Sequence, residues 1–227
     1  MTLATSKGLC LHGYRFSVYT RVVRVVLAEK VLAGELACER REVNPFEPEP
    51  GAEPNPHPFG MVPVLSHGGF VIYETSAIAR YLDAAFPGPA LTPAEPKAAA
   101  RMAQVIAIID AYGYWPMVRQ VFEHRVFRPA AGEPCDEAEI AAEIAAALQA
   151  SDRVLAALEV IAAEGLVLGH GPVTLADCHL APMLAAFTQA PEGAAALARF
   201  PALSRWWQGM AGRPSLTCSD PGLPGRG

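Results

Sequence analysis

Residues 60–65 form an apolar run that Pro63 interrupts. Proline cannot donate a hydrogen bond to a sheet, and the bond before a proline is the one peptide bond for which the cis form is cheap. A cis bond between Val62 and Pro63 would turn the Val62 N–H and C=O outward at the mouth of a cleft. There they could pair with an extended peptide, as an added strand does. This segment is therefore a candidate backbone clamp.

A second candidate site follows at Glu74-Thr75-Ser76, where a helix is predicted to begin. The first N–H groups of a helix have no partner within the helix, and they bind carboxylates well. The Glu74 side chain stands beside these groups. A backbone clamp and an anion site next to an acidic side chain suit a small peptide that carries both a carboxylate and an ammonium group.

The elements that position these residues follow from periodicity and from proline and glycine. Six prolines between residues 45 and 58 exclude a regular helix there. Strands are predicted at residues 8–12, 36–43, 62–65 and 70–73, and helices at residues 17–32 and 75–86. This order, β-α-β, a loop, then β-β-α, is the thioredoxin-like plan, and it closes near residue 86.

Beyond the proline-rich residues 87–96 the pattern is helical throughout. Thr174 to Asp177 has the form of a capping box, which gives Asp177 a structural role. Helices are predicted at residues 97–111, with a bend near Gly113 and Pro116, at 136–164, at 174–189, and around Leu203, Trp206, Trp207 and Met210. The expected division is 1–86, a linker at 87–96, and an all-helical domain at 97–227 that ends in a frayed tail.

Composition excludes several classes of protein. The net charge of −5 and the scattered basic residues argue against nucleic acid as a partner. No apolar stretch reaches the roughly 18 residues of a membrane span, and the first residues lack the pattern of a signal peptide. Five widely spaced cysteines show no zinc-ligand spacing, which favours a reducing cytoplasm and no metal. Cys10 and Cys178 are expected in the core.

The two segments together identify a family resemblance. "GMVPVL" followed by "GGFVIYETSAIARYLDAAFPG" resembles the thioredoxin-like half of the soluble glutathione transferases, whose pattern is valine–cis-proline and then Glu-Ser-x-Ala-Ile-x-x-Tyr-Leu. The capping box and the late "FPALSRWW" resemble the all-α domain of the same family. The resemblance thus covers nearly the whole chain. It implies an α/β thioredoxin-like domain followed by an all-α domain with an electrophile pocket.

The resemblance also implies an activity. Such an enzyme activates the thiol of glutathione for attack on a small hydrophobic electrophile, by conjugation or by reduction of a peroxide, as in detoxification. A protein that binds glutathione or an apolar ligand without turnover is the alternative on the same fold. The family further implies a homodimer, in which Asp110 could reach the γ-glutamyl ammonium of glutathione bound to the neighbour.

Individual residues receive roles by the same resemblance. Aligning Arg24 with the arginine of the family's S-x-x-S-x-x-V-R run puts Ser17 at the position that donates a hydrogen bond to the thiol; by pattern alone Ser17 is a helix N-cap. Tyr14 and Tyr19 are the alternative donors. The backbone of Val62, before Pro63, would pair with the cysteinyl unit. Glu74 and Thr75 would hold the γ-glutamyl end.

The site for the glycyl end of glutathione departs from the family pattern. Met61 stands where relatives often have lysine, arginine or glutamine, and methionine cannot hydrogen-bond a carboxylate usefully. His57 could replace some of the contacts to the glycyl end that the proline-rich loop lacks. The residues expected to line the electrophile pocket are Tyr112, Tyr114, Trp115, Val118 and Arg119.

Overall fold

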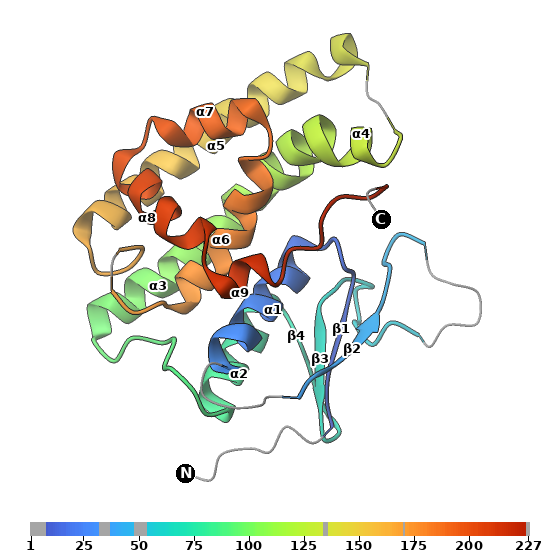
Figure 1. Cartoon of the computed structure of the whole chain (residues 1–227), viewed down its shortest axis with the longest axis vertical. Coiled ribbons are helices and arrows are strands. Elements are labelled where there is room, and N and C mark those ends of the chain that lie inside the picture. Colours follow the sequence, from blue (N-terminus) through green and yellow to red (C-terminus); the bar gives the residue numbers. More distant parts are fainter. Residues whose placement is uncertain (1–7, 32–36, 48–53, 134–135, 170, 226–227) are drawn as a thin grey trace.

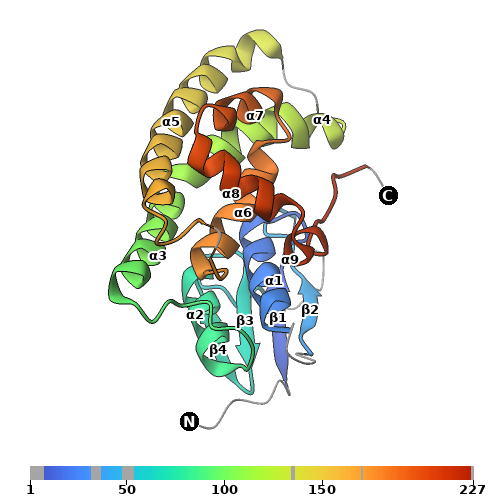
Figure 2. The same ribbon diagram turned by 60° about the vertical axis from the view of Figure 1, so that its left-hand side comes forward.

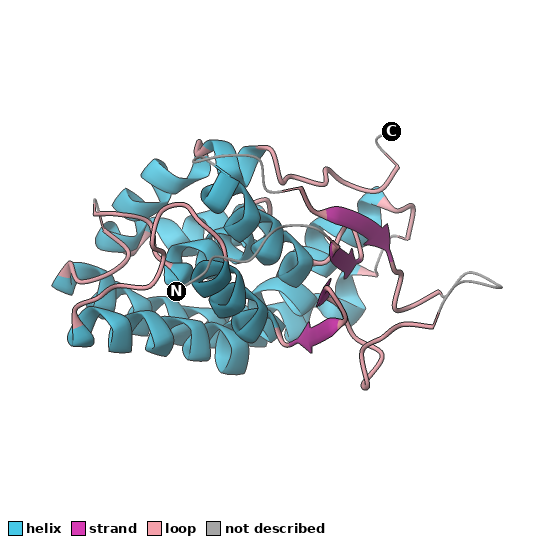
Figure 3. Ribbon diagram, turned by 90° about the horizontal axis from the view of Figure 1, so that it is seen from below, coloured by secondary structure: helices cyan, strands magenta, loops and turns pink. Residues whose placement is uncertain are grey.

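The computed structural model describes residues 8–31, 37–47, 54–133, 136–169 and 171–225. A sheet with two helices lies at one end of the molecule, and a larger group of helices lies at the other end (Figure 1). The view from below separates the strands from the helical group in the same way (Figure 3). The predicted fold, a thioredoxin-like part followed by an all-helical part, is confirmed.

The sheet has four strands in the described part of the chain: β1 (Leu9–Gly13), β2 (Glu39–Glu42), β3 (Val64–His67) and β4 (Phe70–Tyr73). Their spatial order is β2-β1-β3-β4. Strand β1 pairs parallel with β2 and antiparallel with β3, which pairs antiparallel with β4. The order of elements along the chain is therefore the predicted one.

Strand β3 begins two residues later than the predicted strand at 62–65. The bond between Val62 and Pro63 is cis, as predicted. Pro63 has no N–H to give to the ladder, so strand pairing begins at the residue after it. Val62 is therefore outside the ladder, and its backbone groups are not used in pairing β3 with β1.

Helices α1 (Val18–Val31) and α2 (Thr75–Ala85) pack against each other beside the sheet (Figures 1 and 2). The valine-rich face of α1 is buried, and so are the inward-facing residues of the central strands. Branched apolar side chains at helical spacing explain both the helix and its packing. The fully buried residues include Val22, Val23, Val25, Val26, Leu65 and Leu82.

The second part is helical in all of its regular elements that the structure describes. The first long helix continues past residue 111 through turns of π-helix around Gly113 and Pro116, where a bend was predicted. The elements are α3 (Pro96–Ile108), η1 (Ile109–Gly113), η2 (Trp115–Phe127), α4 (Arg128–Ala130), α5 (Glu137–Glu164), α6 (Leu175–Phe187), α7 (Pro191–Ala198), α8 (Pro201–Ala211) and α9 (Pro214–Thr217).

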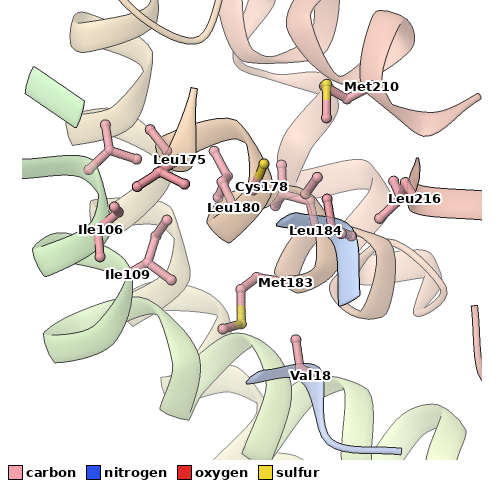
Figure 4. Close-up of a cluster of buried hydrophobic side chains, with 14 of the residues drawn as sticks. Val18, Ile106, Ile109, Leu175, Cys178, Leu180, Met183, Leu184, Met210 and Leu216 are labelled. Carbon is pink, nitrogen blue, oxygen red and sulfur yellow. The ribbon is translucent and has the colours of Figure 1, made fainter. Parts of the chain in front are cut away.

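Apolar side chains from α1, α3, η1, α6, α8 and α9 meet in one buried cluster (Figure 4). Val18 comes from α1, whereas Leu180, Met183 and Leu184 come from α6. The two parts thus share a core, and α1 packs directly on α6. Cys10 and Cys178 are buried, as predicted. Within the described residues, no helix is long and apolar enough to cross a membrane.

A buried ion pair also joins the two parts. The Glu29 carboxylate on α1 is buried and accepts hydrogen bonds from Arg213 Nε at 2.5 Å and Nη2 at 2.7 Å, and from the Ser215 hydroxyl. Burial raises the pKa of Glu29. The hydrogen bonds from Arg213 and Ser215 and the Arg213 charge together lower it by more, so the pKa lies below its usual value. Glu29 is therefore held as a carboxylate.

Candidate functional site

The sheet topology brings three predicted segments to one end. In the register, His12 on β1 faces Val64 on β3, and Val64 faces Tyr73 on β4. The loop after β1, the Val62-Pro63 bond before β3 and the start of α2 after β4 therefore all lie at the same end of the sheet. Residues far apart in the sequence thereby share one site.

The segment before the cis bond is held by the Asn55 side chain. Asn55 Nδ2 donates to the carbonyl of Met61 at 3.0 Å, and its Oδ1 accepts from the backbone N–H of His57. These bonds fix the chain on the N-terminal side of Val62. Asn55 was not predicted as a site residue, because an asparagine among prolines has the pattern of an ordinary turn residue.

His57 is buried, and its ring contacts Tyr73 with centroids 4.9 Å apart. Its Nδ1 accepts from the backbone N–H of Phe59 at 3.1 Å, so the neutral ring carries its hydrogen on Nε2. His57 thus stabilises the loop, whether or not it also contacts a ligand. Met61 is 59% exposed and presents a thioether to solvent.

Helix α2 begins at Thr75 with an open N-terminus. Glu74 is its N-cap residue and makes no capping hydrogen bond with its side chain. Glu74 has φ of 68°, a left-handed conformation that costs a side-chain-bearing residue about 1–3 kcal/mol and is found most often at functional sites. Thr75 is buried. The first-turn N–H groups are therefore free of side-chain caps, as an anion site requires.

Ser17 stands at the start of α1. Its Oγ accepts a hydrogen bond from the backbone N–H of Thr20 at 3.2 Å, and its carbonyl accepts from Arg21. Ser17 is thus an N-cap residue, which is what the pattern alone predicts. Capping uses the hydroxyl oxygen as acceptor and leaves its hydrogen available to a thiolate. The residue also lines a small cavity of about 20 Å³ together with Phe16, Phe122 and Phe127.

Tyr19 is not available as a hydrogen-bond donor to the thiol. Burial, and then the charge of Asp110 and a hydrogen bond to it, strongly raise the pKa of Tyr19. The bond raises the pKa because the phenol donates its hydrogen to the carboxylate. The Tyr19 ring also contacts Tyr114, with centroids 4.7 Å apart. Tyr19 therefore has no second hydrogen to give to a ligand.

Asp110 has partners inside its own chain. Its Oδ1 lies 2.8 Å from Nε2 of His179, a fully buried residue of α6, and its carboxylate accepts from Tyr19. This network ties η1 to α1 and α6. A role of Asp110 at a neighbour's ligand stays a prediction. His179 was not predicted as a partner, because a histidine within an apolar helix has no distinctive spacing.

Four aromatic side chains, Tyr14, Phe16, Phe46 and Phe127, form a cluster next to Ser17. Tyr14 contacts Phe16 and Phe46 with ring centroids 5.5 and 6.1 Å apart, and Phe16 contacts Phe127 at 5.4 Å. Burial, and then Glu42 and Glu47, raise the pKa of the Tyr14 phenol. These edge-to-face contacts make an apolar wall beside the start of α1.

The predicted electrophile-pocket residues are distributed differently. Arg119 lies over the Phe46 ring at 5.7 Å and so borders the aromatic cluster. Val118 is buried in the core, and Tyr114 contacts Tyr19. Tyr112 and Trp115 are 68% and 61% exposed. Phe16, Phe46 and Phe127 were not predicted here, although the position of Phe16 next to Ser17 was a usable signal.

Models of two protein families match the chain. The model described as "Glutathione S-transferase, N-terminal domain" matches residues 11–90, and the model described as "Glutathione S-transferase, C-terminal domain" matches residues 141–208. Together they span well over half of the chain. Among curated proteins, glutathione S-transferase 3 of Zea mays is 27% identical over 223 residues, which cover 95% of each chain.

Solved structures agree over nearly the full length. The apo structure of a glutathione S-transferase III has a TM-score of 0.76 at 27% identity, covering 95% of this chain and 97% of that one. A theta-class glutathione S-transferase from Xanthomonas axonopodis pv. citri, solved with glutathione bound, has a TM-score of 0.71 at 25% identity. That match covers 93% of this chain and 96% of the other.

Proposed function

The chain belongs to the soluble glutathione S-transferase family, and we propose that it binds glutathione at the common end of its sheet and activates the thiol through Ser17. The thiolate then attacks a small electrophile, either conjugating it or reducing a peroxide. The observation that carries this proposal is the meeting of three features at one end of the sheet. They are the capping serine, the cis bond before Pro63 and the uncapped start of α2.

The geometry supports a role for each part of glutathione's site. The Val62 backbone, outside the ladder, pairs with the cysteinyl unit. The open first turn of α2 receives the γ-glutamyl carboxylate, and Glu74 receives the ammonium. The glycyl end has a poorer site, because the exposed Met61 side chain offers no hydrogen bond to a carboxylate.

The chemistry then requires a lower thiol pKa. A free cysteine thiol has a pKa of about 8.5, and the thiolate is the nucleophile. The Ser17 hydroxyl donates to the sulfur, and the positive end of α1 favours its negative charge. With a chlorodinitrobenzene-type substrate, an S–C bond forms, the C–Cl bond breaks and chloride leaves. The thiol proton passes to solvent.

The aromatic cluster of Tyr14, Phe16, Phe46 and Phe127 is the proposed wall of the electrophile site. It lies next to Ser17, and Arg119 supplies a cation at its border. An apolar ring seated there would lie close to a sulfur held at Ser17. We propose a cytoplasmic protein with no metal and no nucleic-acid partner, acting in detoxification. Four described cysteines, at 10, 38, 178 and 218, are free thiols, which fits a reducing compartment.

Glutathione is expected to raise the unfolding midpoint, because a ligand that binds only the native state stabilises it. Glu74→Ala should weaken binding by about 1–3 kcal/mol, through loss of one charged hydrogen-bond partner. Calorimetric titration measures both affinities. Glu139→Ala, at an exposed position of α5, is the matched control and should bind like the parent. An unmoved midpoint with no heat at millimolar glutathione would rule out the site, and equal affinity in Glu74→Ala would remove Glu74 from it.

Turnover of chlorodinitrobenzene separates an enzyme from a carrier. A transferase consumes it with glutathione at a rate above the uncatalysed reaction, whereas a carrier binds glutathione without that increase. The exposed Met61 is the feature that favours the carrier, since it weakens one part of the glutathione site.

The protein is expected to be a homodimer. Exposed apolar side chains on the edge strand β4 and on η1 and η2 support this proposal, among them Phe70, Val71, Tyr112 and Trp115. A stable two-fold interface buries more than about 1,200 Å². Light scattering at micromolar concentration should report about twice the 24.1 kDa mass of the chain. A monomer mass would exclude the dimer, and with it any contribution of Asp110 to a neighbour's site.

A further inference from the structure

A cavity of about 290 Å³ lies between α1, β1, β2 and the C-terminal segment. It is at the β2 edge of the sheet, whereas Glu74 follows β4 at the opposite edge. The cavity is therefore separate from the γ-glutamyl part of the proposed glutathione site. Its position also follows from the docking of α9 beside α1, which is visible in both views (Figures 1 and 2).

Four arginines line this cavity: Arg15, Arg24, Arg40 and Arg41. They come from the loop before α1, from α1 itself and from β2, so the fold and not a sequence motif brings them together. The lining also contains the two carboxylates of Glu42 and Asp220. Positive charge therefore exceeds negative charge by two.

Both lining carboxylates are already engaged. Asp220 Oδ2 lies 3.4 Å from Nη2 of Arg21, which is outside the cavity lining, and Glu42 Oε1 accepts from the backbone N–H of Arg15 at 2.8 Å. Arg41 pairs with Glu39, with 2.9 Å between Nε and Oε1. Among the described residues, Arg24 and Arg40 have no carboxylate within ion-pair distance. Arg24 and Arg40 are thus two lining cations that form no ion pair with a described carboxylate.

Two residues of the cavity lining carry unsatisfied polar atoms. Within the described part, the Thr20 hydroxyl and the Arg24 Nε are buried without a hydrogen-bond partner. Burial, and then the charges of Arg40 and Arg21, lower the pKa of Arg24. Buried polar groups normally have partners, and neighbouring cations repel one another unless an anion lies between them. These groups together suit a ligand with several acceptor oxygens.

We propose that this cavity binds a small phosphate-class anion, held by the guanidinium groups of Arg24 and Arg40 and by the Thr20 hydroxyl. Planar guanidinium groups match phosphate oxygens in paired hydrogen bonds, which an ammonium cannot do. The volume lies near the lower limit of ligand pockets, about 300 Å³, so it suits phosphate or a short organic phosphate.

The test is calorimetric titration of the full-length protein with inorganic phosphate at low ionic strength. Saturable binding is expected, and Arg40→Gln should weaken it about tenfold through loss of one charged hydrogen-bond partner. Arg40 is exposed on an edge strand, so this variant keeps the core intact. Arg205→Gln, on an exposed position of α8, is the matched control and should bind like the parent. Arg24→Gln should weaken binding at least as much as Arg40→Gln.

Two further titrations identify the ligand and test whether its site is separate from the glutathione site. Tighter binding of glycerol phosphate than of phosphate would identify an organic phosphate, and equal binding would identify phosphate itself. Saturating glutathione should leave phosphate affinity unchanged, because the cavity lies at the β2 edge of the sheet and the γ-glutamyl part of the glutathione site follows β4 at the opposite edge. Absence of saturable heat, equal affinity in Arg40→Gln and Arg205→Gln, or displacement by glutathione would each overturn the proposal.

Discussion

Ser17→Ala is expected to slow conjugation about 10- to 100-fold at neutral pH while leaving glutathione affinity nearly unchanged. A charge-assisted hydrogen bond from the hydroxyl contributes about 1.5–3 kcal/mol to the thiolate. At roughly 1.36 kcal/mol per unit, the pKa of the bound thiol falls by about 1–2 units. Without the hydroxyl, less thiolate is present near pH 7. The pH–rate profile should therefore shift to the alkaline side, and high pH should recover part of the rate.

Ser17→Thr is the matched control, because threonine keeps both the hydroxyl and the helix cap. It keeps both functions of the Ser17 hydroxyl, including acceptance of the hydrogen bond from Thr20, and should therefore keep most of the conjugation rate. Tyr14→Phe and Tyr19→Phe should retain most of the rate. An unchanged profile in Ser17→Ala, together with a collapse in one of the tyrosine variants, would move the donor role to that tyrosine.

Arg213→Ala is expected to lower the free energy of unfolding by about 3 kcal/mol at neutral pH, the lower end of the range for breaking a buried ion pair because Arg213 is itself one-third exposed. The variant leaves the Glu29 carboxylate buried without its main partner. Arg101→Ala is the matched control. Arg101 forms a similar two-bond pair with Glu164, but that pair is exposed, so its loss should cost much less. Urea unfolding measures both variants.

The pH dependence of this loss gives a second check. The folded-state pKa of Glu29 is lowered, so its stabilising contribution is present above the unfolded value of about 4.3 and is lost as the pH falls through the folded value. The difference in stability between the parent and Arg213→Ala should therefore shrink below about pH 4. A loss equal to that of Arg101→Ala at neutral pH, or a difference that grows in acid, would contradict this account of Glu29.

Local patterns in the sequence predicted most of the elements. The valine-rich face of α1, the Pro63 bond and the capping box at Thr174 each depend on neighbours in the chain. The capping box forms as predicted, but Asp177 also accepts from Trp206 Nε1 at 2.6 Å, a contact between helices that no local pattern contains. Asp177 is therefore more deeply integrated in the core than a cap alone requires.

The elements that sequence analysis missed begin with proline or depend on distant contacts. Helix α7 begins with Pro191, and its Gly193 packs so closely on Phe187 that an added Cβ would lie 2.1 Å from the Phe187 carbonyl oxygen. Proline and glycine in a sequence usually indicate a loop, so Pro191 and Gly193 did not predict a helix. The tail was expected to fray, but the carbonyl of Pro221 accepts from Arg15 Nη2 at 3.3 Å. Long-range contacts of this kind are not visible in the sequence.

The candidate site likewise combines local features, which the sequence predicts, with long-range contacts, which it does not. The cis bond and the start of α2 are local features, and the structure has both where they were predicted. The partners of Tyr19 and Asp110 depend on His179, which lies 69 residues beyond Asp110 in the chain. The aromatic cluster at Ser17 joins the first loop to the far end of η2 through Phe16 and Phe127. Tertiary packing alone determines these contacts.

Titration of bound glutathione by the ultraviolet absorbance of its thiolate tests the central claim most directly. The parent protein, saturated with glutathione, should show a thiol pKa about 1–2 units below the free value of about 8.5. Ser17→Ala, saturated in the same way, should return the pKa most of the way to the free value. A bound thiol with the free pKa in the parent protein, or an equally lowered pKa in Ser17→Ala, would contradict activation of the thiol by Ser17.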